Sequence, residues 1–158
     1  MGAGSWLVLG LRCSNADYSF AVLDGSKSHP RIVEKGSVRF PHTYSRARQM
    51  GWFKQEIEDR RKHHSISALA IKGAEGIASR GKAFVERIEN EAAAILAAVA
   101  RGIGKVPRKT KSTIAKDLGL KGRAGYLATA LDTSVIAGFN DLPVKEQEAV
   151  LVAWSELH

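Results

Sequence analysis

The stretch from Ser5 to Asp24 most constrains the fold, because it reads as two strands joined by a short polar turn. Residues 6–11 (WLVLGL) form an almost unbroken apolar run, which is typical of a strand buried on both faces. Residues 14–17 (SNAD) supply the turn, and the alternation that follows predicts a second strand. A buried strand that opens into a tight turn is a common place for an active-site residue, and here that residue is Arg12.

The next part of the chain predicts a third strand, a helix and a fourth strand. Residues 31–40 have the pattern of a strand that a proline closes. Residues 44–64 place apolar side chains three and four apart, which predicts a helix. Residues 65–72 (SISALAIK) form the fourth strand, which ends at Lys72.

A long, alanine-rich helix is expected from about Ser79 or Lys82 to Arg101. Glu91 lies close to the apolar stripe of this helix, so we expect its carboxylate to be partly buried and paired. The residues expected to form the buried stripe are Phe84, Ile88, Ala92, Ile95 and Val99.

The remaining elements are shorter. Residues 106–107 are expected to end a fifth strand, and Thr110 or Ser112 is expected to cap a brief helix. Residues 126–139 predict a further helix, and Asp141 is expected to be the N-cap of the last one. In the helix of residues 126–139, the inward side chains should be Leu127, Leu131 and Val135.

This order of elements predicts a single α/β domain over residues 1–158. The sheet should be mixed and five-stranded, with three antiparallel strands first, parallel strands after them, and helices on its flanks. Neither a membrane-spanning apolar run nor a signal-peptide pattern occurs. The one cysteine cannot form an internal disulfide, so we expect a cytoplasmic protein with no membrane partner.

Charge gives the main indication of a partner. The chain carries 24 Lys and Arg against 16 Asp and Glu, a formal net charge of +8. Such an excess suits a polyanion, and DNA or RNA is the usual one, although many basic proteins bind no nucleic acid. The excess is most one-sided in residues 105–123, where glycines would let a ligand approach the backbone; the alternative is a solvated connector. Its basic residues are Lys105, Arg108, Lys109, Lys111, Lys116, Lys121 and Arg123, against the single acid Asp117.

Three stretches resemble the ribonuclease H-like superfamily, in the branch of the RuvC-type Holliday-junction resolvases. They are LVLGLRCSNADYSFAVLDG in the first hairpin, ISALAIKGAEG at the fourth strand and KEQEAVLVAW in the last helix. The chain looks still more similar to a short bacterial family of this fold, the domain of unknown function 3010, in which a basic residue also follows the fourth strand. The resemblance implies a ribonuclease H-like sheet, a nucleic-acid partner that can be branched, and a homodimer formed through the long helix.

The active enzymes of this fold hold carboxylates at the ends of the first and fourth strands and on the last helix. These carboxylates bind two divalent cations, about 4 Å apart, that stabilise phosphodiester displacement. The matching positions here are Arg12, Lys72 and Lys145, and only Glu148 keeps an acid. Arginine and protonated lysine cannot bind a metal ion, so the resemblance implies the fold with a degenerate site, a pseudonuclease without cofactor.

Two questions stay open at this stage. The cations could form a structural ion network with Glu148, or they could bind a phosphate where metals bind in the active enzymes. A shifted carboxylate set of Asp17, Glu75 and Glu148 would instead make a Mg²⁺- or Mn²⁺-dependent endonuclease. A third alternative is a protein-interaction subunit without enzymatic activity. We favour metal-independent nucleic-acid binding through Arg12, Lys72, Lys145 and the basic segment.

Overall fold

The sheet at the centre of the protein has the strand order β3-β2-β1-β4-β5. The computed structural model describes residues 6–76 and 81–158. Strands β1 (Val8–Cys13), β2 (Asp17–Gly25) and β3 (Pro30–Arg39) are antiparallel neighbours, while β4 (Ala68–Lys72) and β5 (Arg108–Lys109) run parallel to β1. The mixed sheet predicted from the order of elements is therefore confirmed.

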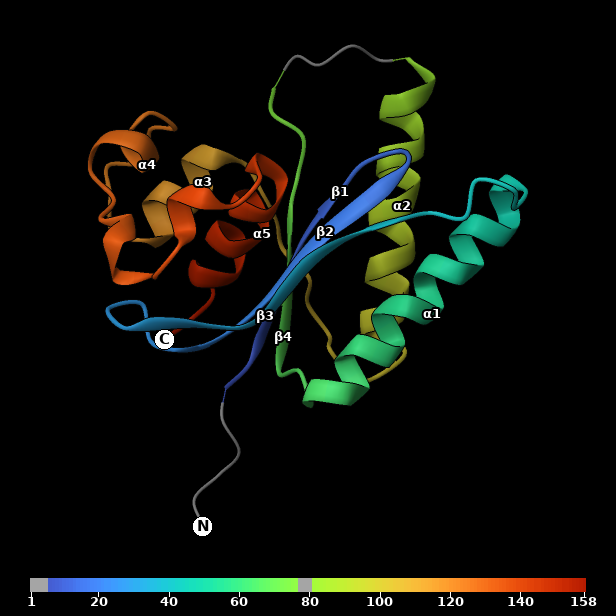
Figure 1. The fold of residues 1–158 in the computed structure, drawn as a ribbon, viewed down its shortest axis with the longest axis horizontal. Coiled ribbons are helices and arrows are strands. Elements are labelled where there is room, and N and C mark those ends of the chain that lie inside the picture. The colour runs from blue at the N-terminus through green and yellow to red at the C-terminus, as the bar shows by residue number, and fades with distance from the viewer. Residues whose placement is uncertain (1–5, 77–80) are drawn as a thin grey trace.

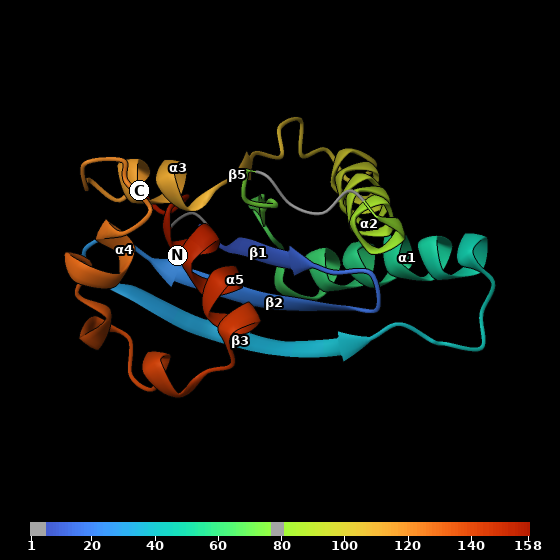
Figure 2. The ribbon, with the colours of Figure 1, turned by 90° about the horizontal axis from the view of Figure 1, so that it is seen from above.

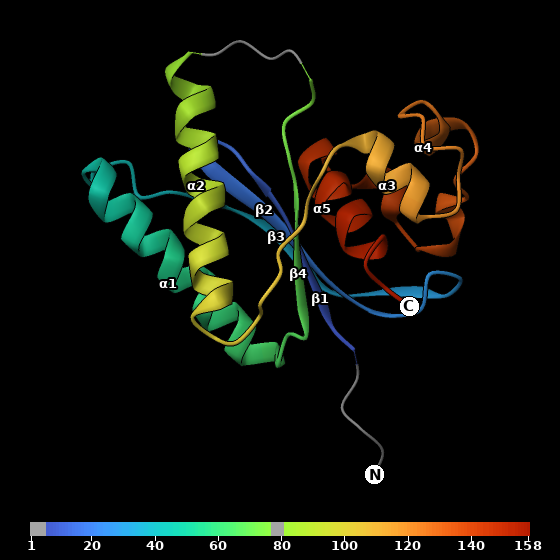
Figure 3. The ribbon, with the colours of Figure 1, turned by 180° about the vertical axis from the view of Figure 1, so that it is seen from behind.

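Helices cover both faces of this sheet (Figure 1). Helices α1 (Arg46–His64) and α2 (Lys82–Val99) lie on one face. The other face carries α3 (Lys111–Asp117), α4 (Tyr126–Thr129), the 3-10 turns η1 (Thr133–Val135) and η2 (Phe139–Asp141), and α5 (Val144–Trp154). Figure 2 views the two layers from above and Figure 3 from behind.

Strand β1 is buried on both faces, as its apolar run predicts. Val8, Leu9 and Leu11 have no exposed surface. Leu9 and Leu11 belong to the core that the sheet forms with α1 and α2, whereas Val8 belongs to the core that it forms with α5. The turn after β1 is held from the α2 side, because the amide of Asn90 donates to the carbonyl of Ser14 at 2.8 Å.

Helix α5 lies very close to β1 because the strand carries a glycine there. A Cβ at Gly10 would lie 2.1 Å from the carbonyl oxygen of Ala149 and 2.9 Å from the Cβ of Ala153. Only a residue without a side chain fits this contact. The contact sets the height of α5 above the sheet, and therefore the place of the side chains that α5 carries to the carboxyl end of β1.

The buried face of α2 differs from the predicted stripe. The fully buried positions are Asn90 and Glu91 with four alanines, and Val99 is 53% exposed. Alanine lets the helix approach the sheet and α1 closely, so the small residues face inward and the larger apolar ones are displaced to the side. The predicted burial of Glu91 is confirmed, whereas the predicted start at Ser79 lies outside the described residues.

Residues 126–139 do not form the single helix that we predicted. Helix α4 ends at Thr129, and the chain continues through η1 to Gly138, whose φ of +77° favours glycine. Leu127 is buried as expected, but Val135 is 45% exposed.

Two predicted boundaries near the carboxyl terminus are also wrong. The N-cap of α5 is Pro143, and Asp141 belongs to η2. Strand β5 starts one residue beyond the predicted end at Pro107. The predicted cap at Thr110 is correct, since its hydroxyl accepts from the backbone of Thr113. No helix in the described part of the chain is long and apolar enough to cross a membrane.

We predict that Gly10→Ala destabilises the fold by about 3 kcal/mol or more, because the new methyl group meets backbone atoms that cannot move aside. Chemical denaturation measures this change. Gly51→Ala is the control, since Gly51 lies in α1 with nothing within 4 Å of its added Cβ. That variant should gain about 0.5–1 kcal/mol from helix propensity. Equal stability of the two variants would contradict the close contact.

Candidate nucleic-acid interface at the carboxyl ends of β1 and β4

Three basic side chains from different elements come together where β1 and β4 end. Arg12 comes from β1, Lys72 from β4 and Lys145 from α5. Glu148, one turn after Lys145 on α5, links the first two: its Oε1 accepts from Arg12 Nε at 3.0 Å, and its Oε2 lies 3.7 Å from Lys72 Nζ. The resemblance placed these four residues at one site; in the structure Arg12, Lys72 and Glu148 are in contact, and Lys145 lies one turn before Glu148 on α5.

Lys72 is a buried cation with its own set of acceptors. Its side chain is 2% exposed, and its ammonium donates to the carbonyl of Gly73 and to Glu75 Oε2, both at 2.6 Å. Glu148 lies beside this group at 3.7 Å. A buried charge is stable only when it is paired and hydrogen-bonded, and the two hydrogen bonds together with the nearby charge of Glu148 meet that need.

Glu75 also joins this site to α3, since its Oε2 accepts from the backbone N–H of Lys111 at 2.9 Å. Partial burial raises the pKa of Glu75. The hydrogen bonds from Lys72 and from the Lys111 backbone outweigh it, so the pKa is held below the ordinary 4.5.

Lys145 has a separate partner. Its ammonium lies 3.2 Å from Asp17 Oδ1, and Asp17 also accepts from the hydroxyl of Ser14. Burial raises the pKa of Asp17, but the hydrogen bonds from Ser14 and Lys145 hold it below the ordinary 3.8. Asp17 is therefore ionised at neutral pH, and it anchors Lys145 above the turn between β1 and β2.

A second buried carboxylate extends the site toward α2. Glu91 is 1% exposed and lies 3.3 Å from Arg87 Nε and 3.4 Å from Arg108 Nε. Burial raises the pKa of Glu91 despite both guanidinium groups. Burial lowers the pKa of Arg87, and the nearby charge of Arg12 lowers it further, so positive charges crowd here. Arg87 was not predicted as a site residue, although its four-residue spacing from Glu91 is that of an ion pair on a helix.

These side chains are not suited to bind the two divalent cations that the resemblance to active nucleases would imply. Each carboxylate of the shifted set, Asp17, Glu75 and Glu148, already contacts a lysine or arginine of the protein. Within the described ranges, no three His, Cys, Asp or Glu side chains gather as metal ligands. The cationic groups of Arg12 and Lys72 lie against Glu148 and Glu75 and would repel a metal ion.

The basic segment of residues 105–123 is divided among several places. Lys105 lines a hollow beside Ala68, at the amino end of β4, away from Arg12. Arg108 and Lys109 are neighbours on a strand, so they point to opposite faces of the sheet. Arg108 reaches Glu91 on the α2 face.

Lys109 is buried on the α5 side of the sheet, and its ammonium group is surrounded by partners from the protein. Its Nζ lies 2.7 Å from both Asp117 and Glu156 and donates to Ser155 Oγ at 2.9 Å. With two carboxylates around it, Lys109 holds α3 to the end of α5, which leaves its charge unavailable to a ligand.

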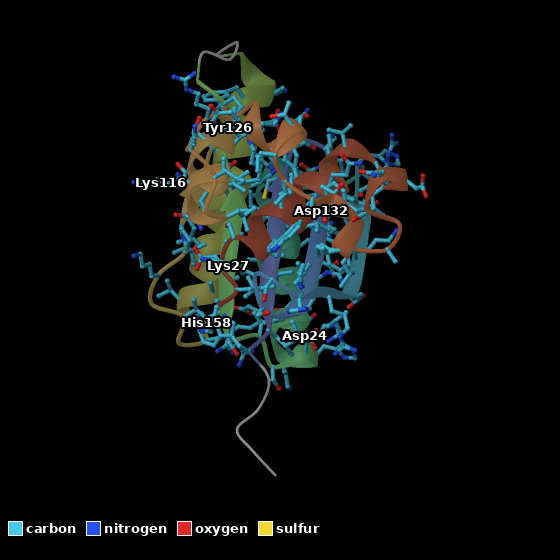
Figure 4. The ribbon with its side chains drawn as sticks, turned by 90° about the vertical axis from the view of Figure 1, so that its left-hand side faces the viewer. Asp24, Lys27, Lys116, Tyr126, Asp132 and His158 are labelled. Atoms are coloured by element: carbon cyan, nitrogen blue, oxygen red, sulfur yellow. The ribbon has the colours of Figure 1, made fainter. Side chains whose placement is uncertain are left out.

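The remaining basic residues of the segment lie on the α3 side of the protein. Lys111 starts α3 beside Glu75, and the other three are exposed on α3 and the loop after it. Figure 4 shows this side, with Lys116 and Tyr126 labelled. The three exposed residues are Lys116, Lys121 and Arg123.

We predict that the ion pairs of Asp17 and Glu75 make stability depend on pH in the acid range. A carboxyl whose pKa is lower in the folded than in the unfolded protein stabilises the fold above its ordinary pKa, and this contribution is lost as pH falls through the folded value. The ordinary values are 3.8 and 4.5, so the loss should begin below about pH 4.5. Urea unfolding across pH 2–7 should show a shallower acid limb for Glu75→Gln. Identical acid limbs would exclude the Lys72–Glu75 pair.

Comparison with solved structures identifies the fold that carries this site. No protein-family model and no curated protein matches the sequence. The structure of Thermus thermophilus RuvC superposes with a TM-score of 0.71 at 13% identity, covering 94% of this chain and 92% of RuvC. The same enzyme in complex with a Holliday junction substrate gives a TM-score of 0.69 at 14% identity, with 95% and 91% covered. The yeast mitochondrial Holliday junction resolvase Ydc2 gives 0.63 at 8% identity, with 96% and 77% covered. This protein has the ribonuclease H-like fold of the RuvC-type junction resolvases.

Proposed function

We propose that this protein binds branched nucleic acid through a metal-independent site and does not cleave it. The observation that carries the proposal is the placement of Arg12, Lys72 and Lys145 at the ends of β1 and β4 and on α5. In the active nucleases of this fold, carboxylates at these places hold metal ions. Two of the structures with the same fold are RuvC and Ydc2, and RuvC is described with a junction bound.

The charge balance supports an anionic ligand. Five cationic side chains meet four carboxylates at the strand ends, which leaves a net positive charge before Lys111 is counted. Arg12 uses Nε for Glu148 and Nη1 for the carbonyl of Cys13, and its Nη2 makes no hydrogen bond with the described residues. This second amino group is the natural donor to a phosphate oxygen.

The exposed residues Lys116, Lys121 and Arg123 extend the positive surface along α3 and the following loop. Contacts between such side chains and phosphates give affinity that falls steeply with salt and carries no base sequence information. Selection of branched over linear nucleic acid would then come from shape.

We also propose a homodimer formed through α2. Val85, Leu96 and Val99 are 49%, 60% and 53% exposed, and their spacing of 11 and 14 residues from Val85 places them on one side of the helix. An exposed apolar stripe of this kind is typical of an interaction surface. A dimer would present two cationic sites to a branched ligand.

We predict a metal-independent, salt-dependent affinity for a labelled four-way junction, measured by fluorescence anisotropy in EDTA. Changing Lys116, Lys121 and Arg123 together to Ala should lower the slope of log affinity against log salt by roughly 2–3, about one unit for each lost phosphate contact. These side chains are exposed, so stability should not change. Arg31→Ala is the control, because Arg31 is 74% exposed at the opposite end of the sheet, and affinity should stay within about twofold.

Arg12→Ala separates the anion site from a purely structural ion network. Removing Arg12 should weaken junction binding about tenfold, the loss of one charge-assisted contact. A fall in thermal stability with unchanged affinity would assign Arg12 a structural role only. Cleavage of the junction in Mg²⁺ or Mn²⁺, abolished by Glu148→Gln, would replace the proposal with the endonuclease alternative. No binding at low salt would leave the protein-interaction subunit.

Leu96→Glu tests the dimer. We predict that the wild-type protein sediments as a dimer in analytical ultracentrifugation and that this variant sediments as a monomer, since a buried glutamate has no partner in an apolar interface. Val33→Glu is the matched control, because Val33 is 40% exposed on β3, the strand at one edge of the sheet, and does not belong to α2. A wild-type monomer at high protein concentration would rule out the dimer.

A further inference from the structure

A cleft of about 370 Å³ lies between α4, the two 3-10 turns and α5. Its walls are mostly apolar and include Leu127, Leu131, Phe139 and Leu151. This volume is near the lower limit of small-molecule sites, which run from about 300 to 1,000 Å³, so it suits one planar group rather than an extended cofactor.

The cleft opens beside the cationic site. Glu148 and Lys111 line it, and Glu148 is the carboxylate that accepts from Arg12 at 3.0 Å. Lys111 makes no ion pair among the described residues, while its backbone N–H is held by Glu75 at 2.9 Å. A phosphate bound by Arg12 or Lys111 would therefore lie at the mouth of the apolar cleft.

Two amide side chains give the cleft a polar edge. Gln147 donates through Nε2 to the carbonyls of Phe139 and Asn140 at 3.2 and 3.4 Å, which leaves its Oε1 free to accept. Asn140 accepts through Oδ1 from the hydroxyl of Thr133 at 3.1 Å, which leaves its NH₂ group free to donate. One acceptor and one donor complement the pairing edge of adenine, which offers a donor and an acceptor.

We infer that this cleft receives an unpaired nucleobase from the branch point of a bound nucleic acid, while the neighbouring phosphate lies on Arg12 and Lys111. This inference rests on the proposed function and deepens it, because it states how a branched ligand with an unpaired base is distinguished from a fully paired one. An apolar slot next to cations takes a base that has left the stack, and a fully paired duplex has no such base to offer.

The experiment measures anisotropy in EDTA with a labelled four-way junction that carries one unpaired adenine at its branch point. A second junction has an abasic nucleotide in place of that adenine. The unmodified protein should bind the adenine junction at least about tenfold more tightly, the size of effect that burial of one base produces. This comparison needs no protein variant.

Ala128→Trp fills the cleft, because Ala128 is exposed on α4 and lines it. The variant should bind the adenine junction about tenfold more weakly than the unmodified protein does. Its affinity for the abasic junction should be unchanged, since the substitution and the missing base remove the same interaction. Ala130→Trp is the matched control: Ala130 is exposed two residues later and does not line the cleft. Thermal unfolding of both variants verifies that they are folded.

The outcomes separate the two proposals. Equal affinity of the unmodified protein for the adenine and abasic junctions overturns the base cleft and leaves metal-independent binding in place. If Ala128→Trp also weakens binding of the abasic junction, so that the two losses of affinity add, the base cleft is overturned as well, because the base then lies elsewhere. No binding of either junction at low salt overturns the proposed function itself, and the base cleft with it.

Discussion

Glu148 is the carboxylate on which the arrangement at the strand ends depends. It contacts Arg12 at 3.0 Å and lies 3.7 Å from Lys72, whose side chain is 2% exposed. Removing one partner of a buried ion pair typically costs about 3–5 kcal/mol, because the other charge is left uncompensated. Glu148 reaches both cations only because α5 lies against β1, and α5 can do so only over a glycine at position 10. The ion pairs of the site therefore depend on the same close packing of α5 against β1 that forms the core.

The internal cations change how such a site meets its ligand. In a nuclease of this fold, the carboxylates are neutralised by metal ions that arrive from solution. Here Lys72 and Arg12 neutralise Glu148 and Glu75 from within the chain. Both acids are balanced by cations of the chain itself, and the site as a whole keeps a surplus of positive charge. A metal site at this place would require the removal of both cations together with the addition of acids.

The sequence predicted the sheet and the residues at its strand ends because both follow from short-range patterns. An apolar strand that is buried on both faces belongs in the middle of a sheet, and Arg12 follows from this as the residue at the carboxyl end of a central strand. Burial on α2 was not predictable from hydrophobicity, since alanines face the core and Val99 faces outward. The run from Arg108 to Lys109 looked like one basic surface, but alternation along a strand sends the two side chains to opposite faces. The base cleft gave no sequence signal, because it is assembled from α4, η2 and α5 only after they pack.

Affinity and discrimination come from different parts of this surface. Phosphate contacts from the exposed basic residues act on any nucleic acid, and their strength falls with salt. In our proposal, a cleft that takes one base discriminates by whether a base is free, and burial of apolar surface depends little on salt. Raising the salt concentration should therefore weaken duplex and junction binding together while the ratio between them changes little.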